Sequence, residues 1–240
     1  MKINKQGNVY TVVYIIVIAV VVGAALAIVS MALKDRQQAN ADADKMSQIL
    51  ASAHITAAGG DVIAAFNDHI IDQPVYNANG GLVEGEKAFN VDIAAEAKKA
   101  DKDRLLPLYI CKTDDGAVKV IVPLSGAGLW GPIWGYLALN NDATFSVYGA
   151  YFGHQGETPG LGAEIVKPEF TDQFTGKNIL AADGQFTGIA VVKKGQKPAT
   201  DVPYVDGVSG GTITSKGVDA MLANCLRPYE PVLKSLQIQE

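Results

Sequence analysis

The stretch VVYIIVIAVVVGAALAIVSMAL, at residues 12–33, is a run of 22 residues without a single charge. With about 1.5 Å of rise per residue, a helix of this length reaches about 33 Å and crosses a hydrocarbon core of about 30 Å. A cleaved signal peptide has a shorter apolar region, typically ~7–15 residues. The nearby Ala-x-Ala sequence, at residues 41–43, lies eight residues beyond the run. We therefore predict one uncleaved transmembrane helix; a signal peptide and a buried core helix are the alternatives.

The charges divide unevenly on the two sides of this run. Lys2 and Lys5 stand before it, and every aspartate and glutamate follows it. Basic residues near the two ends of the run are almost equal in number, and the positive-inside rule counts chiefly those. The short arm and the acidic remainder favour a cytoplasmic arm at residues 1–11 and an ectodomain outside the cytoplasm.

Composition excludes several classes of protein. The chain has 240 residues, 48% of them hydrophobic, which allows one domain with an appendage. Its formal net charge of −5 argues against a nucleic-acid binder, since such proteins usually carry a basic face. Two cysteines, Cys111 and Cys225, exclude a disulfide framework or a four-cysteine metal site, and we expect both as free thiols.

The ectodomain has an α+β pattern in two parts. Residues 34–58 lack Pro and Gly and predict a helix that continues from the membrane and ends at Gly59 and Gly60, within a helical and irregular part at residues 34–104. The second part, residues 105–240, contains the strand signals and a final helix. We predict strands at residues 117–124, 136–139, 144–152 and 185–194, and a helix at residues 214–227.

The glycines at residues 126–131 formally fit the G-x-G-x-x-G pattern of a dinucleotide-binding turn. That fold needs a helix directly after the turn, whereas here Pro132 and a strand follow. A glycine-rich connection between strands is one reading, and presentation of Leu129 and Trp130 to a flat ligand is the other. The three histidines, His54, His69 and His154, have no metal-site spacing, and we expect neither a metal site nor a catalytic residue.

Two other glycine-rich segments indicate an anion site. They read GHQGETPGLG at residues 153–162 and DGVSGGTITS at residues 206–215, the second directly before the final helix. Glycines let backbone N–H groups point outward, and the helix dipole favours a negative charge. Thr214 or Ser215 is expected to cap the helix. The residues thus predict a phosphate near Thr212, with an ordinary capped helix start as the alternative.

The sequence DGVSGGT at residues 206–212 resembles the motif D-x-x-[ST]-G-[AG]-T of the FMN-binding domain family, in which the last threonine carries FMN through a phosphoester bond installed by a flavin transferase. Residues 157–162 (ETPGLG) match a second family motif. Residues 128–130 with 135–139, and residues 106–109 (LPLY), match a third and a weaker fourth. With the single span, the resemblance covers essentially the whole chain; Gly211 departs from the usual alanine.

Within this family the chain is similar to the C subunits of Na⁺-translocating NADH:quinone reductases and, less closely, to the G subunits of Rnf electron-transport complexes. The resemblance implies covalent FMN on Thr212 and an electron-relay function without stand-alone activity. It implies further cofactor contacts by Ser209, Gly210, Gly211, Leu129, Trp130, Glu157, Thr158, Leu161, Gly162, Lys194 and Thr214.

The resemblance also implies partners and a location. The partners are the A, B, D, E and F subunits of the reductase, the flavin transferase and membrane lipid, with no nucleic acid. The location is the bacterial inner membrane, with the ectodomain on the periplasmic side. An Rnf-type G subunit and a cofactor-free, membrane-tethered assembly module are the alternatives.

Overall fold

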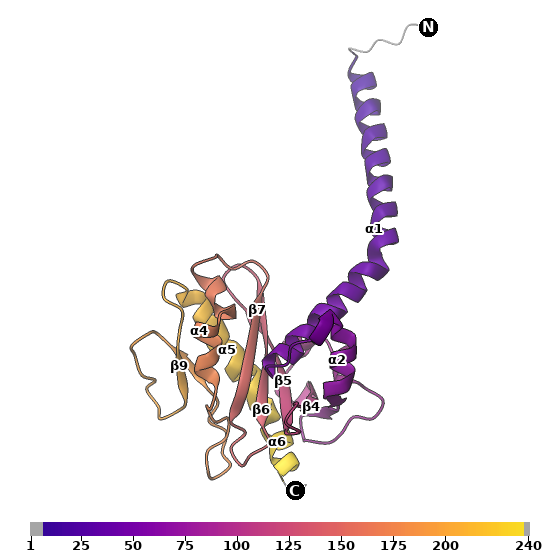
Figure 1. The fold of residues 1–240 in the computed structure, drawn as a ribbon. Coiled ribbons are helices and arrows are strands. Elements are labelled where there is room, and N and C mark those ends of the chain that lie inside the picture. Colours follow the sequence, from indigo (N-terminus) through magenta and orange to yellow (C-terminus); the bar gives the residue numbers. More distant parts are fainter. Residues whose placement is uncertain (1–6, 238–240) are drawn as a thin grey trace. The chain divides into compact units, whose positions relative to one another are not determined.

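The computed structural model describes residues 7–237, which form two compact units divided after Lys45. Helix α1 (Asn8–Ser52) begins in the first unit and ends in the second (Figure 1). Within the first unit the helix is continuous through residues 12–33, and its apolar side chains there are exposed. Among the described residues it is the one helix long and apolar enough to cross a membrane, as the sequence predicts.

The predicted end of this helix at Gly59 and Gly60 is wrong, because α1 ends at Ser52. His54 adopts a positive φ of 58°, which turns the chain away from the helix axis. The N–H of Ile55 then donates to the carbonyl of Leu50 (3.0 Å), and the N–H of His54 donates to that of Ala51 (3.0 Å). These two bonds are the Schellman pattern, which satisfies the last carbonyls of a helix.

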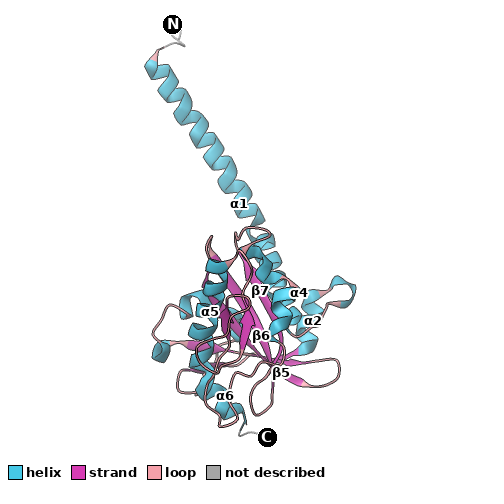
Figure 2. Cartoon of the chain, turned by 90° about the vertical axis from the view of Figure 1, so that its left-hand side faces the viewer, coloured by secondary structure: helices cyan, strands magenta, loops and turns pink. Residues whose placement is uncertain are grey.

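The second unit is built on a five-stranded antiparallel sheet in the order β1-β4-β5-β6-β7. Figure 2 shows its long strands, in magenta, between the helices. The strands are β1 (Ile70–Asp72), β4 (Tyr109–Lys112), β5 (Val118–Ala127), β6 (Pro132–Asn140) and β7 (Val147–His154). The last three confirm predicted strands. Two small pairs complete the strands: β2 (Val75–Asn77) with β3 (Leu105–Pro107), and β8 (Ala190–Val192) with β9 (Tyr204–Asp206).

The strand predicted at residues 185–194 is much shorter than expected. Only Ala190–Val192 is a strand, because Gly188 has a φ of +65° and an isolated bridge joins Phe186 to Leu180. Lys194 therefore lies in the turn after β8, where the N–H of Gln196 donates to the carbonyl of Lys193 (2.9 Å).

Helices and short turns cover both faces of the sheet. The longer helices are α2 (Val62–His69), α5 (Thr212–Leu226) and α6 (Glu230–Gln237); α3 (Ile93–Glu96) and α4 (Pro168–Thr171) are single turns. Short 3-10 turns lie at Ala58–Gly60, Ala88–Asn90, Asp101–Asp103, Gly162–Val166, Asp172–Phe174 and Arg227–Tyr229. The mixture confirms the predicted α+β class.

The side-chain alternation of the strands makes two cores. On one face Val122 and Leu137 pack against Leu222 of α5, and on the other Ile121 packs with Ile49 from the end of α1. Figure 1 shows α5 and α2 on opposite sides of the sheet. The second face includes residues from before position 105, so strands and helices from both predicted parts of the ectodomain share one unit.

Helix α5 approaches the sheet closely at two glycines. A Cβ on Gly217 would lie 2.3 Å from the carbonyl oxygen of Ala127, and one on Gly126 would lie 2.7 Å from the Met221 side chain. The absence of a side chain at both positions lets the start of α5 lie directly against the end of β5. This contact places the first turn of α5 next to the turn between β5 and β6.

Candidate functional site

The turn between β5 and β6 presents two apolar side chains to solvent. Ala127 pairs with Pro132, and the N–H of Gly128 donates to the carbonyl of Gly131 (2.8 Å), which closes a hairpin. At its tip Leu129 is 47% exposed and Trp130 is 65% exposed. The G-x-G-x-x-G segment is therefore a hairpin, as predicted from Pro132, with apolar groups at its tip.

The residues before α5 fold into a tight loop, and the helix begins at Thr212, two residues earlier than predicted. Gly211 is the N-cap residue and caps no amide with a side chain. The first-turn amides of a helix have no carbonyl partner within it, and the dipole adds about half a positive charge there. Thr212 itself is exposed at this positive end of α5.

The prediction that Thr214 or Ser215 caps the helix is wrong. Because α5 begins at Thr212, both residues lie inside its first turn rather than before it. The hydroxyl of Thr214 donates to Oε2 of Glu157 (2.5 Å), and Oγ of Ser215 accepts a hydrogen bond from the N–H of Val208 (2.9 Å). The Ser215 hydroxyl thus holds the loop before α5, and the Thr214 hydroxyl joins α5 to Glu157.

Glu157 joins three segments that are distant in sequence. Its carboxylate, 4% exposed, accepts the Thr214 hydroxyl on Oε2 and the N–H of Trp130 on Oε1 (2.9 Å). Burial by itself raises the pKa of Glu157, but the hydrogen bonds from Thr214, Trp130 and Leu129 outweigh it, so the net pKa lies below its ordinary value. The ionised carboxylate therefore links the hairpin tip to α5. We call Glu157 with its bonds to Thr214 and Trp130 the clasp.

Glycines make room for this clasp. A Cβ on Gly162 would lie 2.3 Å from both Glu157 Oε2 and Thr214 Oγ1, and one on Gly128 would lie 2.3 Å from Glu157 Oε1. Gly210 has a φ of +79°, and a Cβ there would meet Leu161 at 2.7 Å. The glycines of three separate segments thus serve a single packed junction.

Two hollows border Thr212. The first, which we call the apolar hollow, measures about 230 Å³. Its lining consists of Leu129, Glu157, Thr158, Leu161, Gly162, Gly210, Gly211, Thr212, Ile213 and Thr214. The second, which we call the lysine hollow, measures about 630 Å³. Its lining includes Lys193, Lys194, Lys197 and Lys216, and no acidic residue.

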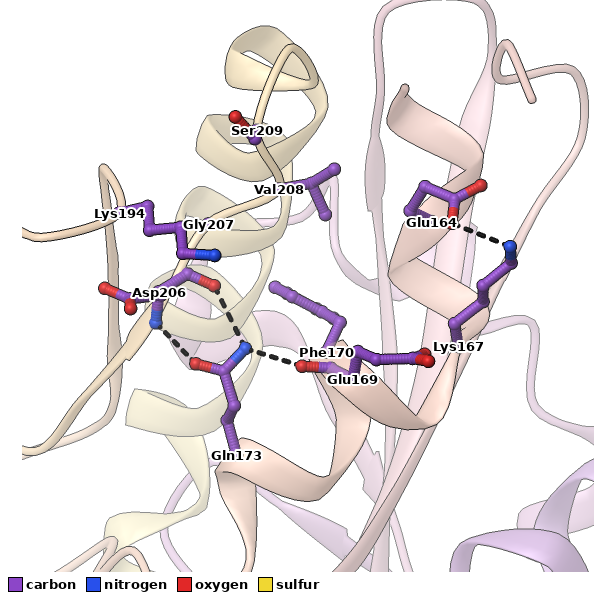
Figure 3. Close-up of a pocket in the computed structure, with 10 residues that line it drawn as sticks. All are labelled: Glu164, Lys167, Glu169, Phe170, Gln173, Lys194, Asp206, Gly207, Val208 and Ser209. Carbon is purple, nitrogen blue, oxygen red and sulfur yellow. Dashed lines mark hydrogen bonds and ion pairs between the residues drawn. The ribbon is translucent and has the colours of Figure 1, made fainter. Parts of the chain in front are cut away.

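A third hollow, of about 500 Å³, adjoins the loop and shares Lys194 and Ser209 with the lysine hollow. In its wall Gln173 accepts the N–H of Asp206 on Oε1 (2.8 Å) and donates Nε2 to the Asp206 carbonyl (3.3 Å) (Figure 3). The Asp206 carboxylate accepts the N–H of Gly195 (3.2 Å). Gln173 and Asp206 therefore fix the loop and the lysine-bearing turn together.

Comparison with known proteins assigns the family. Residues 128–227 match the FMN-binding domain family. The chain is 35% identical over 209 residues to the C subunit of the Na⁺-translocating NADH-quinone reductase of Vibrio parahaemolyticus, with 79% of each chain covered. It is 30% identical over 240 residues to that of Pseudomonas aeruginosa, with 91% of each covered. The chain belongs to the family of NqrC, the C subunits of Na⁺-translocating NADH-quinone reductases.

Solved structures of this family agree with the fold. The crystal structure of the C subunit from Parabacteroides distasonis has a TM-score of 0.76 at 45% identity and covers 84% of this chain and 96% of its own. The NqrC structure from Shewanella oneidensis has a TM-score of 0.67 at 25% identity and covers 83% and 100%. The matched FMN-binding domain contains the hairpin tip, Glu157 and the start of α5.

The structure brings most of the predicted contact residues together. Nine of the predicted residues line the apolar hollow, whereas Ser209 and Lys194 line the other two hollows. Trp130 lies at the hairpin tip beside the apolar hollow's Leu129, without being part of the hollow's lining. Glu157 and Thr214 both line the apolar hollow, but they hydrogen-bond to each other. Glu157 Oε2 and the Thr214 hydroxyl therefore already have partners without a cofactor.

Sequence reasoning missed Ile213 and the three lysines other than Lys194. Ile213 is 57% exposed in the first turn of α5 and lines the apolar hollow. Helical spacing gave a signal for it, since Ile213 is an apolar residue off the buried stripe that includes Val218 and Leu222. Lys193, Lys194 and Lys197 directly follow β8, whereas Lys216 lies in α5, so only the fold brings them together.

The donor set and the space suit flavin mononucleotide. The lysines and the first-turn amides suit an anionic phosphate, and the exposed side chains of Leu129, Leu161 and Ile213 suit the faces of a flat ring. Among the described residues, no group of three His, Cys, Asp or Glu side chains could hold a metal ion. Cys111 and Cys225 are buried free thiols, as predicted.

Proposed function

We propose that the chain is the membrane-anchored electron-carrier subunit of a Na⁺-translocating NADH:quinone reductase, with FMN bound to Oγ of Thr212 through a phosphoester bond. The observation that carries the proposal is the position of Thr212. Its exposed side chain stands at the start of α5, on the border of the apolar hollow and the lysine hollow. A ligand with a flat apolar ring and a charged phosphate matches both sides of that border.

The neighbouring hydroxyls are less suitable for the linkage. Thr214 is 1% exposed and bonds to Glu157, and Ser215 is buried and bonds to the Val208 amide. Ser209 is exposed but lines the lysine hollow and not the apolar one. Among these four hydroxyl residues, Thr212 alone lines both hollows with an exposed side chain.

The chain's own residues would bind and orient the group. A phosphodiester carries one negative charge, which the first-turn amides of α5, its dipole, and the side chains of Lys194 and Lys216 would offset. Leu129 and Ile213 would exclude water from one face of the ring. FMN supplies the ability to accept and release electrons; the protein supplies attachment, orientation and charge.

The family also supports a place in the complex. We infer that the A, B, D, E and F subunits are partners, that a separate flavin transferase installs the FMN, and that residues 12–33 anchor the chain in the inner membrane with the domain on the periplasmic side. Family membership and the single apolar helix support this reading. The named relatives are quinone-reductase subunits, which favours this assignment over an Rnf-type G subunit.

The test is flavin attachment in variants co-expressed with a flavin transferase. Wild type and Thr212→Ser keep a hydroxyl at the border of the two hollows and should give a fluorescent band under ultraviolet light on a denaturing gel. Thr212→Val keeps the shape without the hydroxyl and should give none while the domain stays folded. A band of wild-type strength in Thr212→Val would reject the linkage, and no band in wild type would favour a cofactor-free assembly module.

A further inference from the structure

Glu157 is a buried carboxylate balanced chiefly by hydrogen bonds. Oε1 accepts the Trp130 amide and Oε2 the Thr214 hydroxyl, and its own N–H donates to Nδ1 of His154 (3.2 Å). Lys99, Arg104, Lys167 and Lys234 form ion pairs with carboxylates other than Glu157. A full negative charge therefore remains in the wall of the apolar hollow.

We infer that the fixed negative charge of Glu157 lowers the midpoint potential of the flavin carried at Thr212. The inference rests on the proposed function, because it needs an electron acceptor in the apolar hollow. The negative charge of a buried carboxylate is screened less than one in bulk solvent, so it opposes the addition of an electron nearby. The hydrogen bonds from Thr214 and Trp130 hold that charge in place without neutralising it.

Two roles of the carboxylate have to be separated, the clasp and the charge. Glu157→Gln has the same shape, and its amide oxygen still accepts the backbone N–H of Trp130, while the Thr214 hydroxyl rotates to accept from the amide nitrogen. This variant keeps most of the clasp and removes the charge. Thr214→Val has the opposite effect. It removes the hydrogen bond from Thr214 to Glu157 but leaves the negative charge of Glu157 in place.

The experiment is a spectroelectrochemical titration of the covalent flavin in the full-length, detergent-solubilised protein at mildly alkaline pH, where carboxylates are ionised. Glu157→Gln should raise the midpoint potential, and Thr214→Val should leave it unchanged or lower it. A midpoint that is unchanged or lower in Glu157→Gln would overturn the inference. So would equal upward shifts in both variants, since a loosened clasp would then explain them.

A second pair of variants covers the case in which Glu157→Gln does not fold or take up flavin. Thr158 is exposed in the wall of the same hollow, so substitutions there leave the core intact. Thr158→Glu adds a negative charge and should lower the midpoint, whereas Thr158→Gln is its neutral match and should not. The two midpoints are compared at low ionic strength, where an exposed charge is screened least. Equal midpoints in these two variants under that condition would also overturn the inference.

The outcomes distinguish the inference from the function on which it rests. Absence of covalent flavin from the wild-type chain would overturn the proposed function, and with it this inference. Covalent flavin with a midpoint insensitive to charge at residues 157 and 158 would overturn the inference alone.

Discussion

The Thr214 hydroxyl should stabilise the domain more than a helix cap would. It bonds to the ionised, buried carboxylate of Glu157, and a hydrogen bond to a charged group contributes about 1.5–3 kcal/mol. Thr214→Val should therefore lower the free energy of unfolding by about that amount in urea denaturation. Thr158→Val, at an exposed position in the same hollow, is the control and should change it by no more than about 0.5 kcal/mol. Equal losses of unfolding free energy in Thr214→Val and Thr158→Val would show that the bond to Glu157 adds no more stability than an exposed hydroxyl does.

The same bond gives the domain a pH dependence with a definite sign. Hydrogen bonds from Thr214, Trp130 and Leu129 outweigh the upward effect of burial, so the pKa of Glu157 is lowered in the folded state. A carboxyl group with a lowered folded-state pKa stabilises the protein above its unfolded-state pKa, and that contribution is lost as the pH falls through the folded-state value. The difference in free energy of unfolding between wild type and Thr214→Val should therefore become smaller as the pH falls. A difference that grows as the pH falls would contradict the assignment of Glu157 as ionised in the folded state.

Trp130 tests whether the hairpin tip contacts the flavin. Its side chain is 65% exposed, and its backbone amide makes the bond to Glu157, so Trp130→Ala removes the ring and spares the clasp. Because a stacked indole quenches flavin emission, the variant should have brighter flavin fluorescence, with a stability change within about 0.5 kcal/mol. Trp130→Phe leaves an aromatic face there and should stay closer to wild type. Unchanged flavin emission in Trp130→Ala would show that the indole does not contact the flavin.

At the scale of elements, the seating of α5 against β5 positions the site. A helix interior normally favours Ala over Gly by about 1 kcal/mol. Gly217→Ala should nevertheless destabilise the domain, because the new Cβ would lie 2.3 Å from the backbone carbonyl of Ala127. Ala220→Gly, at an exposed position on the same helix, should cost about 1 kcal/mol by propensity alone. Thermal unfolding of the two variants checks this; a stabilising Gly217→Ala would show that α5 can move away from β5.

The sequence was informative for elements with strong periodicity and poor for short or non-local ones. The helix through residues 12–33, the three long strands and α5 all have runs whose pattern is set locally. Strand β1 has three residues and exists because it pairs with β4, which lies far along the chain. The end of α1 depends on a left-handed His54, a conformation that composition does not reveal.

The candidate site shows the same division. Glycine-rich segments and the family motif pointed to Thr212 and to most of the lining of the apolar hollow. The bond between Thr214 and Glu157 joins residues 57 positions apart, so local pattern reasoning assigned Thr214 to helix capping instead. The lysine hollow likewise combines a turn after β8 with the first turn of α5. Contacts made only by the tertiary fold were the ones that the sequence could not supply.

At the scale of the whole molecule, we expect the chain to stay anchored in the membrane. Residues 12–33 should remain in the mature protein, because the apolar run has the length of a membrane span. N-terminal sequencing of the membrane-extracted protein should therefore start at or near residue 1, and the full chain should need detergent for extraction. A mature terminus near Asp44 would show that the run is removed.

The side of the membrane is a separate prediction. With the short N-terminal arm inside, the domain and its end at Glu240 should face the periplasm. A reporter that is active only in the cytoplasm, fused after Glu240, should stay silent, while one that is active only in the periplasm should give signal. The opposite pair of results would reverse the topology and place the site on the cytoplasmic side.

The most direct test of the linkage at Thr212 is peptide mass spectrometry on the wild-type chain co-expressed with a flavin transferase. Thr212 lies in the tryptic peptide that ends at Lys216, together with Ser209, Thr214 and Ser215. We predict that this peptide gains the mass of one FMN less one water, and that fragmentation places the gain on Thr212. A gain on Ser209, Thr214 or Ser215, or an unmodified peptide from a chain that carries flavin elsewhere, would contradict the assignment.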